Sequence, residues 1–452
     1  MDDAMDISTD TTNDEILLAA TNHDLPALRS LLRNGGSAQI QDPDTGFSPL
    51  HAAIASCEAD DDDDLTKNGE GDALHSLALS EESALETVKF LLENGAVWNE
   101  LDNDDETPGC MALRLGVKTV YDELVSAGVR AELLFGRLDA FALLPDDDDE
   151  EEEEEEEDNA IIGFEPAPPA DHRGANGSVG TNTPQKVEGF EPAPNPSYKI
   201  DEENPIPSLT QTSPNGEETA PTQPIQTNAN VNTNNNSYLA STLTYSRDRL
   251  MDSDSNAVMM DWETEIMSIS AAQLTPTTGL RTMNVGHGMG IVDRMFLARE
   301  PAMHHIVEAH PEVLARLRET GWYEKPNVTI HEGRWQDVLP ALIAKGEVLD
   351  GIYYDTYAED YKDLKVFFAE YVVALLDAKG LFRFYNGLGA DRQVCYDVYT
   401  KVVEVDLFDA GLEVVWTDVA VPDLNGKGEW EGVRYPYWNV EMYRLPTCRF
   451  VG

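Results

Sequence analysis

Basic side chains are scarce in this sequence. It has 31 Lys and Arg residues against 85 Asp and Glu residues, which gives a formal net charge of −54 at pH 7. Nucleic acids and anionic membranes attract proteins through Lys and Arg, so this balance argues against both as main partners. The charge favours a basic protein as the partner, although an excess of acid can also serve solubility alone.

Paired cysteines, an apolar leader and long apolar runs are missing as well. No Cys-x-x-Cys pair occurs among the four scattered cysteines, which argues against a zinc site and a disulfide framework. The opening segment, "MDDAMDISTD", lacks the basic and apolar regions of a signal peptide. No apolar run approaches the roughly 20 residues that a membrane span requires. We therefore expect a soluble protein of the cytoplasm, the nucleus or both.

Composition divides the 452 residues into four parts: a tail (1–12), a helical region (13–143), a linker (144–236) and an α/β region (237–452). The linker begins with thirteen consecutive acids, Asp146–Asp158, and continues with many Pro, Asn, Thr and Ser residues. Such a composition cannot bury a core and predicts disorder. "GFEPAP" occurs twice in it, as a short docking motif or as a chance duplication.

The helical region contains an internal repeat. Residues 31–35 (LLRNG) match residues 91–95 (LLENG) at an offset of 60, and "SPLHAA" and "NGAVWNELD" occur in the two units. The acidic insertion "CEADDDDDLTKNGEGDA" accounts for the excess over an ankyrin period of about 33 residues. The region resembles ankyrin repeats with a degenerate third unit. It would act as a protein-docking surface, or as a structural cap or spacer.

The α/β region alternates β-rich runs with helical patterns. Seven predicted strands cover residues 280–286, 304–310, 327–333, 349–356, 380–387, 412–421 and 437–445, with helices expected from Met289, Pro311, Trp335, Tyr361 and Arg392. This alternation predicts a mostly parallel sheet with helices on both faces, as in a Rossmann-like α/β fold. The last two runs have no convincing helix between them, so we expect them to pair antiparallel.

A glycine-rich loop follows the first of these strands. In "MNVGHGMGIVDRMF", Gly286, Gly288 and Gly290 would let backbone N–H groups approach a ligand, because no Cβ atom intervenes. Glu308 closes the second strand, where an acid binds ribose hydroxyls in nucleotide sites. The pairing suits a dinucleotide dehydrogenase or a methyltransferase that uses S-adenosylmethionine, and a turn without a ligand is the remaining alternative.

Two features favour the methyltransferase. Ile291 stands where a dinucleotide fingerprint would continue with its final glycine, so the helix lacks the close approach that a pyrophosphate needs. The fourth strand ends in a second acid, Asp355, at the edge of the sheet where the ligand crevice is expected.

Five motifs then occur in one order: "VMMDWETEIM", "VGHGMGIVD", "VEAHP", "GRWQDV" and "IYYDTYAED". Together they resemble guanidinoacetate methyltransferase, and more strongly the fungal protein arginine N5-methyltransferases, called type IV, which carry an ankyrin-like N-terminal region. The resemblance implies a class I methyltransferase fold, S-adenosylmethionine as the cofactor, and an arginine of a large-subunit ribosomal protein as the target.

The resemblance also implies a set of cofactor-binding residues at matched positions: Tyr238, Met259, Met267, His287, Gly288, Met289, Gly290, Ile291, Val292, Glu308, Ala309, His310, Trp335, Gln336 and Asp355. Met259 and Met267 would line the pocket, Glu308 would hold the ribose, and Trp335 with Gln336 would border the adenine. Tyr245 competes with Tyr238 for the upstream contact. The relatives usually carry Phe at the position of His287.

Glu263 and Asp355 are the expected catalytic residues. A guanidinium is a poor nucleophile because its charge is delocalised and its pKa exceeds about 12. Carboxylates can orient it, localise its charge and bind its planar fork bidentately. With both terminal nitrogens held, the internal nitrogen faces the methyl donor, and the resemblance identifies this as the acceptor, the δ (N5) nitrogen of arginine.

Blander alternatives exist for these residues. Met259, Met267 and Trp335 could serve packing alone, whereas Glu359 and Asp360 are expected to be solvated. The histidines show no metal-ligand spacing, so we expect no metal. A methyltransferase for a small guanidino compound and an inactive scaffold are the competing functions, and we expect a monomer.

Overall fold

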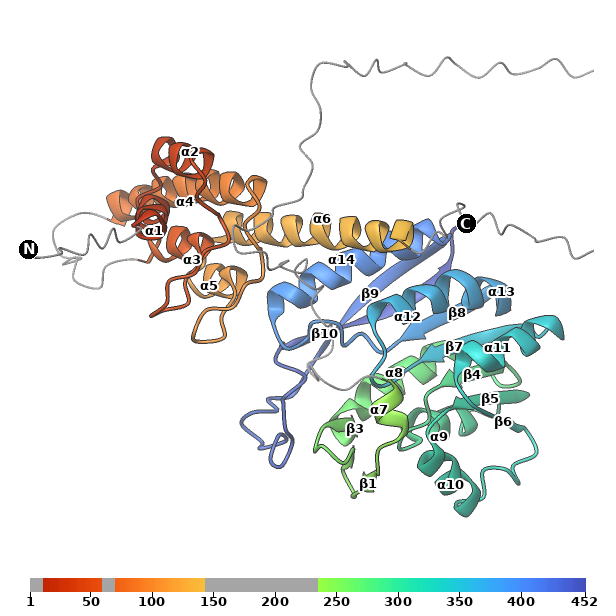
Figure 1. Ribbon diagram of the computed structural model, residues 1–452. Coiled ribbons are helices and arrows are strands. Elements are labelled where there is room, and N and C mark those ends of the chain that lie inside the picture. The colour runs from red at the N-terminus through yellow and green to blue at the C-terminus, as the bar shows by residue number, and fades with distance from the viewer. Residues whose placement is uncertain (1–10, 59–69, 143–234) are drawn as a thin grey trace, which may run out of the picture. The chain divides into compact units, whose positions relative to one another are not determined.

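The computed structural model describes residues 11–58, 70–142 and 235–452 (Figure 1). These residues belong to one compact unit, which comprises Met1–Ala142 and Pro224–Gly452. The first ten residues, most of the acidic insertion, the acidic run and both "GFEPAP" copies lie outside the described residues, so the predictions for them stay predictions. Within the described ranges, no helix has the length and apolar character needed to cross a membrane.

Helices make up most of residues 12–142. They are α1 (Thr12–Thr21), α2 (Leu25–Arg33), α3 (Pro49–Ala55), α4 (Glu70–Glu93), α5 (Pro108–Arg114) and α6 (Lys118–Ala142). The repeat in the sequence has a counterpart in local geometry. Ser48 and Thr107 each cap a helix by accepting a backbone N–H three residues on, and a proline follows each cap.

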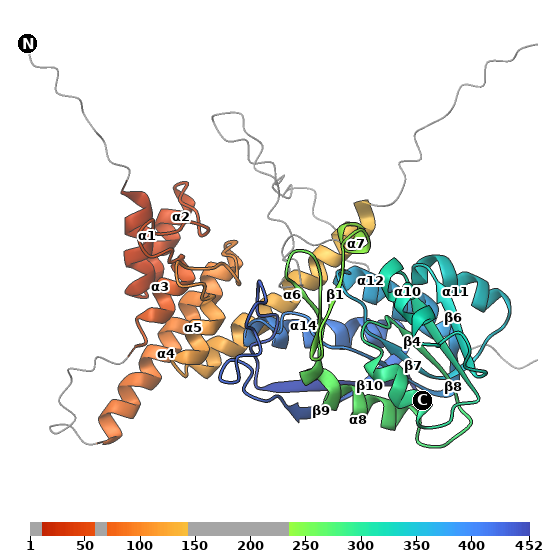
Figure 2. The ribbon, with the colours of Figure 1, turned by 90° about the horizontal axis from the view of Figure 1, so that it is seen from below.

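The helical region does not close its core with its own residues. Buried side chains such as Leu50, Leu91 and Leu124 form one cluster with four residues from the far end of the sequence, namely Val394, Cys395, Val398 and Val402. These four belong to α14 (Gln393–Asp409), which packs against α6 on one side and β9 (Leu412–Ala420) on another (Figure 1, Figure 2). Residues 13–143 and 237–452 therefore share a hydrophobic core.

A seven-stranded sheet organises the α/β region, in the order β6-β5-β4-β7-β8-β10-β9. The remaining strands are β4 (Arg281–Val285), β5 (Met303–Glu308), β6 (Val328–Glu332), β7 (Leu349–Tyr354), β8 (Leu376–Phe384) and β10 (Met442–Phe450). Strands β6, β5, β4, β7 and β8 pair in parallel, and β10 is antiparallel to both of its neighbours. The mostly parallel sheet with an antiparallel last strand is confirmed.

The last strand was placed too early in the sequence. It was expected at residues 437–445, whereas β10 begins at Met442, because the preceding aromatic segment belongs to a loop between β9 and β10. Apolar content alone could not separate these two environments, since both bury aromatic side chains.

Helices cover both faces of the sheet. They are α8 (Thr264–Leu274), α9 (Ile291–Leu297), α10 (Pro311–Glu319), α11 (Trp335–Ala344), α12 (Tyr361–Val366), a π-helical turn (Phe367–Val372), α13 (Val373–Leu375) and α14. Ile352 and Tyr353 are adjacent in β7 and so point to opposite faces. Ile352 packs in the cluster with α11, α12 and α14, and Tyr353 packs in the cluster with α8 and α9.

Three short strands were missed by the sequence analysis. Strands β1 (Thr244–Tyr245), β2 (Arg249–Met251) and β3 (Ala257–Met260) form a small antiparallel sheet after the short helix α7 (Asn235–Leu239). Strands of two to four residues give almost no periodic signal. Strand β3 leads directly into the 3-10 turn Asp261–Glu263, so the small sheet positions Glu263.

Candidate active site

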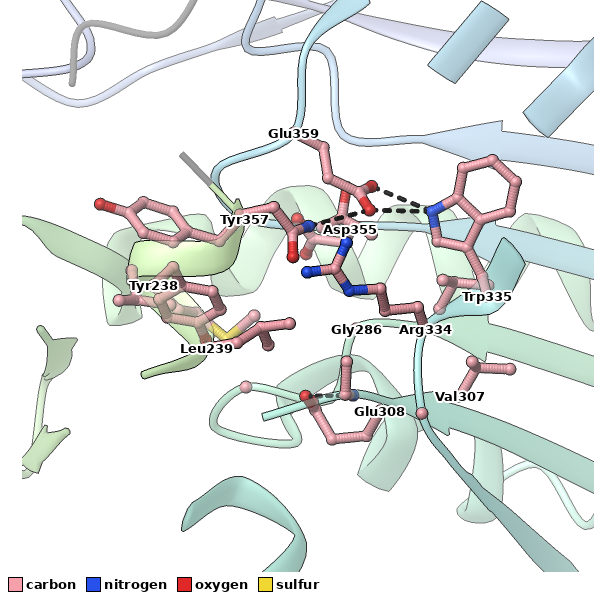
Figure 3. A pocket seen from close by; sticks show the side chains of 18 residues that line it. Tyr238, Leu239, Gly286, Val307, Glu308, Arg334, Trp335, Asp355, Tyr357 and Glu359 are labelled. Atoms are coloured by element: carbon pink, nitrogen blue, oxygen red, sulfur yellow. Dashed lines mark hydrogen bonds between the residues drawn. The ribbon is translucent and has the colours of Figure 1, made fainter. Parts of the chain in front are cut away.

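A cavity lies where β4, β5 and β7 end (Figure 3). Seven of the residues expected to bind the cofactor line it: Tyr238, Met259, Gly288, Glu308, Ala309, Trp335 and Asp355. They come from α7, β3, the glycine loop and three strand ends, and Figure 3 shows Tyr238, Glu308 and Trp335 on different sides of the cavity. This is the crevice position that parallel α/β sheets use for ligands.

Two glycines set the shape of the loop beside this cavity. Gly286 has φ +94°, and a Cβ atom there would lie 1.9 Å from the carbonyl oxygen of Asp355. Gly290 has φ +70°, and a Cβ atom there would lie 2.6 Å from the ring of His287. Both positions combine a left-handed backbone with no room for a side chain, so the loop requires glycine at each.

Glu308 is buried and its carboxylate is held by backbone groups. Its Oε2 accepts the N–H of His287 at 2.9 Å, and its Oε1 accepts the N–H groups of Ala309 at 2.8 Å and His310 at 2.7 Å. The carboxylate is therefore fixed at the edge of the cavity with its remaining lone pairs available. Hydroxyl donors such as those of a ribose are the groups it can accept from.

Trp335 and Glu359 form another wall. The buried indole Nε1 of Trp335 donates to both carboxylate oxygens of Glu359, at 2.9 and 3.1 Å, and the hydroxyl of Tyr354 also donates to Glu359. Burial raises the pKa of Glu359. The expectation that Glu359 is solvated was wrong, because the turn after β7 folds back over Trp335, whereas Asp360 is exposed as expected.

Eight residues of the expected cofactor set do not line this cavity: Met267, His287, Met289, Gly290, Ile291, Val292, His310 and Gln336. Met267 is fully buried in the core between α8 and the sheet, and Ile291 and Val292 turn inward in the first turn of α9. His310 caps α10 and contributes only its N–H to Glu308. Tertiary packing decides these orientations, and a matched motif does not contain that information.

His287 anchors the glycine loop from behind. Its Nδ1 lies 2.7 Å from Asp293 Oδ2, and its ring packs edge-on against Trp322. The other Asp293 oxygen lies 2.8 Å from His304 Nε2. Burial alone would raise the pKa of Asp293, but the contacts with His287 and His304 outweigh it and lower that pKa to about 2. The side chain thus ties the loop to α9, and its backbone N–H serves Glu308.

Tyr238 and Tyr245 have different places. Tyr238 lines the cavity and packs against the rings of His310 and Tyr357, each at 4.8 Å between ring centroids. Tyr245 lies outside the lining and directs its hydroxyl to the carbonyl oxygen of Gly288 at 3.4 Å. The structure therefore favours Tyr238 as the upstream contact.

A second cavity adjoins the first. The two share five lining residues, Val258, Asp355, Thr356, Tyr357 and Glu359. The second is also lined by Glu263, Asp360, Tyr385 and Tyr437. Its described lining contains four carboxyl groups and neither Lys nor Arg, so it suits a cation.

Glu263 is 5% exposed and has two hydrogen-bond donors. The hydroxyl of Tyr437 donates to Oε1 at 2.6 Å, and the backbone N–H of Met260 donates to Oε2 at 3.3 Å. Burial raises the pKa of Glu263 to about 7, with these hydrogen bonds acting in the opposite direction. The indole of Trp262 in turn donates to the Tyr437 hydroxyl at 3.0 Å, which orients it.

Asp355 faces both cavities. Its Oδ2 is shielded from solvent and has no hydrogen-bond partner within the described part of the chain. Burial raises the pKa of Asp355 well above its usual range, and the nearby charge of Glu263 adds to the effect. Two carboxyl groups that are this poorly compensated form a site for a ligand with positive charge and several N–H donors.

Several of these residues were missed by the sequence analysis. Tyr385 and Tyr437 line the second cavity, and Asn235, Val258 and Arg334 line the first. The aromatic run around Tyr437 was a usable signal, since hydroxyl groups at a carboxylate site commonly orient it. Nothing in the sequence connected that run to Glu263, which lies 174 positions away.

S-adenosylmethionine fits the first cavity. The loop at Gly286 gives backbone a close approach, Glu308 offers a fixed acceptor for ribose hydroxyls, and Trp335 supplies an aromatic wall. This cofactor supplies an electrophilic methyl group on a sulfonium. Within the described residues, no group of three or more His, Cys, Asp or Glu side chains is arranged to hold a metal ion.

Solved methyltransferase structures show only a partial likeness to the chain. The crystal structure of M. jannaschii TYW2 in complex with AdoMet is 10% identical, with a TM-score of 0.30 over 47% of this chain and 87% of that one. The O-methyltransferase TomG from Streptomyces achromogenes, in complex with SAM, is 14% identical, with a TM-score of 0.30 over 43% and 81%.

Similarity in sequence identifies the family of the chain. The family model for guanidinoacetate N-methyltransferase matches residues 233–407. Protein arginine N-methyltransferase 2 of Aspergillus fumigatus is 50% identical over 98% of this chain and 97% of that protein. The proteins of the same name from Emericella nidulans and Neurospora crassa are 47% and 41% identical over 99% and 97% of this chain, and 98% and 95% of their own lengths. The chain belongs to the fungal protein arginine N-methyltransferase 2 family.

Proposed function

We propose that this protein transfers a methyl group from S-adenosylmethionine to the δ (N5) nitrogen of an arginine residue in a protein. The observation that carries the proposal is the second cavity, where Glu263 and Asp355 face the same space beside the cofactor cavity. Its described lining offers no Lys or Arg to neutralise them.

The two carboxyl groups favour one orientation of a guanidinium. Each can accept hydrogen bonds from a terminal nitrogen, and together they match the planar fork of arginine. Asp355 lines both cavities, so it holds the guanidinium at their junction. The internal nitrogen is the one left without a carboxylate partner, and it is placed toward the cofactor side. Positioning supplies most of the acceleration in such a scheme, with charge stabilisation by the carboxylates.

A protein substrate is favoured over a small guanidino acid. A small substrate such as guanidinoacetate carries a carboxylate of its own, and the described lining of the second cavity has four carboxyl groups and no cationic side chain to meet it. An arginine residue within a basic protein carries no such carboxylate. The net charge of −54 favours a basic partner as well.

We extend the proposal to the partner and the setting. The substrate is a basic protein of the large ribosomal subunit, recognised without direct contact with nucleic acid. The ankyrin-like helical region provides the docking surface, and the enzyme works as a monomer in the cytoplasm and the nucleus. A methyltransferase for a small guanidino compound is the alternative that the family model at residues 233–407 favours.

Product analysis tests the proposal. The full chain is incubated with labelled S-adenosylmethionine and a fraction of ribosomal proteins, and mass spectrometry identifies the methylated nitrogen. We expect δ-methylated arginine in a protein. Methylation only at the terminal nitrogens, or label only in small molecules, would overturn the proposal, and the absence of transfer despite cofactor binding would favour an inactive scaffold.

A further inference from the structure

A hydrogen bond joins the helical region to the α/β region at Tyr121. The side chain lies on α6 and is buried, and its hydroxyl donates to Asp397 Oδ2 on α14 at 2.5 Å. The residues beside it on α14, Val394 and Val398, belong to the core that the two regions share. Tyr121 thus makes a polar contact beside the apolar side chains of this interface.

Asp397 also contacts a residue of the sheet. Its Oδ1 lies 2.5 Å from Arg444 Nη2 on β10 and accepts the side-chain N–H of Gln393 at 2.9 Å. The Arg444 guanidinium also packs over the ring of Tyr396, and its backbone N–H donates to the Tyr396 hydroxyl at 2.8 Å. The ion pair of Asp397 with Arg444 therefore holds β10 against α14, and the contacts of Arg444 with Tyr396 add to this hold.

The path continues to the second cavity through Asn386. This residue is fully buried, and its Nδ2 donates to the Tyr396 hydroxyl at 3.1 Å and to the carbonyl oxygen of Arg444 at 3.2 Å. Its backbone N–H donates to the Tyr443 hydroxyl at 2.8 Å. Asn386 stands between Tyr385 and Gly387, and both of these line the cavity that contains Glu263 and Asp355.

A continuous set of hydrogen bonds thus connects α6 to the wall of the second cavity. Its members are Tyr121, Asp397, Arg444, Tyr396 and Asn386. Tyr121, Tyr396 and Asn386 are buried, where a hydrogen bond has no competing water and a lost partner is costly, whereas Asp397 and Arg444 are half-buried.

We propose that Tyr121 and Asp397 are positioning residues for the guanidinium cavity, so that the helical region is part of the active-site scaffold as well as a surface for docking. The inference rests on the proposed function, since it assigns the second cavity to the substrate arginine. It predicts that a change in the helical region, remote from both cavities, alters substrate use and leaves cofactor binding unchanged.

A matched control exists on the same pair of helices. The hydroxyl of Tyr399 on α14 donates to Glu132 Oε2 on α6 at 3.0 Å, so Tyr399→Phe also removes one hydroxyl from this interface. No hydrogen bond leads from Tyr399 to Asn386 among those of the described residues. A purely structural role of the interface would make Tyr121→Phe and Tyr399→Phe equivalent.

Full-length wild type, Tyr121→Phe, Asp397→Asn and Tyr399→Phe are compared by steady-state kinetics with a protein substrate and by calorimetric titration with S-adenosylmethionine. For Tyr121→Phe we expect a fall of about tenfold in kcat/KM, mainly through KM, with an unchanged Kd for the cofactor. Asp397→Asn should act in the same direction. Tyr399→Phe should match wild type in both measurements. Equal effects of the two Tyr→Phe changes, or no effect of Tyr121→Phe, would overturn the inference.

Titration with arginine amide separates this inference from the proposed function. If wild type binds arginine amide but methylates no arginine, the proposed function fails, and the positioning role is then read from affinity. Tyr121→Phe should weaken arginine amide binding by about tenfold relative to Tyr399→Phe. No binding of arginine amide to wild type, in the presence of S-adenosylmethionine, would remove both proposals.

Discussion

The carboxyl groups of the two cavities differ in their hydrogen-bond partners. In the first cavity, Glu308 is buried, and three backbone N–H groups donate hydrogen bonds to its two carboxylate oxygens. In the second, Glu263 has two donors and a pKa of about 7, and Asp355 has an oxygen with no partner among the described residues and a raised pKa. Glu308 can accept further hydrogen bonds from neutral hydroxyl groups, whereas Glu263 and Asp355 suit a ligand that carries positive charge.

This difference separates cofactor binding from catalysis. A carboxylate that the backbone already holds can accept a further hydrogen bond from a ribose hydroxyl. A carboxyl pair with raised pKa values gains most from a ligand that carries positive charge. In the proposed function, the same residue type would therefore serve recognition in one cavity and orientation of the reacting group in the other.

The largest effect is expected from Glu263→Gln. The substitution keeps the shape of the side chain and removes the charge that would pair with the guanidinium. We expect kcat/KM for arginine to fall by about 10²- to 10³-fold or to become undetectable. The Kd for S-adenosylmethionine should stay close to wild type, and the melting temperature should not fall, because the substitution removes a carboxyl whose ionisation is unfavourable in the folded protein. Initial rates, calorimetric titration and thermal unfolding measure the three quantities.

Asp360→Asn is the matched control for that change. Asp360 also lines the second cavity but is exposed, so loss of its charge should change kcat/KM little. Near wild-type turnover in Glu263→Gln and in Asp355→Asn would show that these two carboxyl groups do not hold the guanidinium during the reaction.

Glu308→Ala should act on the other cavity. It removes the proposed ribose acceptor and leaves three backbone N–H donors without their partner, that of His287 in the glycine loop and those of Ala309 and His310 after β5. We expect the Kd for S-adenosylmethionine to rise by about ten- to a hundredfold. Turnover at saturating cofactor should fall much less than in Glu263→Gln. An unchanged Kd in a titration would sink the ribose assignment.

The smallest expected effect is a pH dependence from Glu263. Its pKa of about 7 in the folded protein means that it is largely protonated at pH 6 and cannot pair with a guanidinium until the proton leaves. The value of kcat/KM should therefore rise by about tenfold from pH 6 to pH 8. Rates measured across this range, with a substrate whose own charge is constant, would reveal a flat profile if Glu263 does not titrate there.

The raised pKa of Glu263 also makes the stability of the fold depend on pH. A carboxyl with a pKa of about 7 in the folded protein and its ordinary pKa of 4.5 in the unfolded chain binds more protons in the folded state between these pH values. The free energy of unfolding should therefore fall as pH rises from about 4.5 to about 7. Glu263→Gln should flatten that part of the profile, as measured by thermal unfolding without ligand.

Periodicity was a good guide to the α/β region. Helices α10, α11 and α12 begin at Pro311, Trp335 and Tyr361, where they were expected, and five of the seven strands overlap their predicted runs closely, whereas β8 begins four residues before its run and β10 five residues after the start of its run. These elements alternate regularly, and helix starts are marked by local capping chemistry. The small sheet before Glu263 was missed because its strands are too short to show a pattern.

The candidate site was only partly predictable. Glu263, Glu308 and Asp355 stand at strand ends or within motifs, so sequence order could assign them. Tyr437 and Asn386 act through contacts with residues far away in the sequence, to Glu263 in one case and Arg444 in the other. Such contacts arise when the loops after β8 and β9 fold over the sheet, and no local rule encodes them.

The sequence by itself determined the alternation of strands and helices, the glycine loop, the acids that end two strands and the excess of negative charge, because each depends on neighbouring residues or on composition alone. Only the tertiary structure decided that Glu263 and Asp355 share a cavity, that Glu359 is half-buried against Trp335, and that α14 completes the core of the helical region. Those outcomes depend on burial and on long-range packing, which set the pKa values and the unpartnered oxygen on which the proposed chemistry rests.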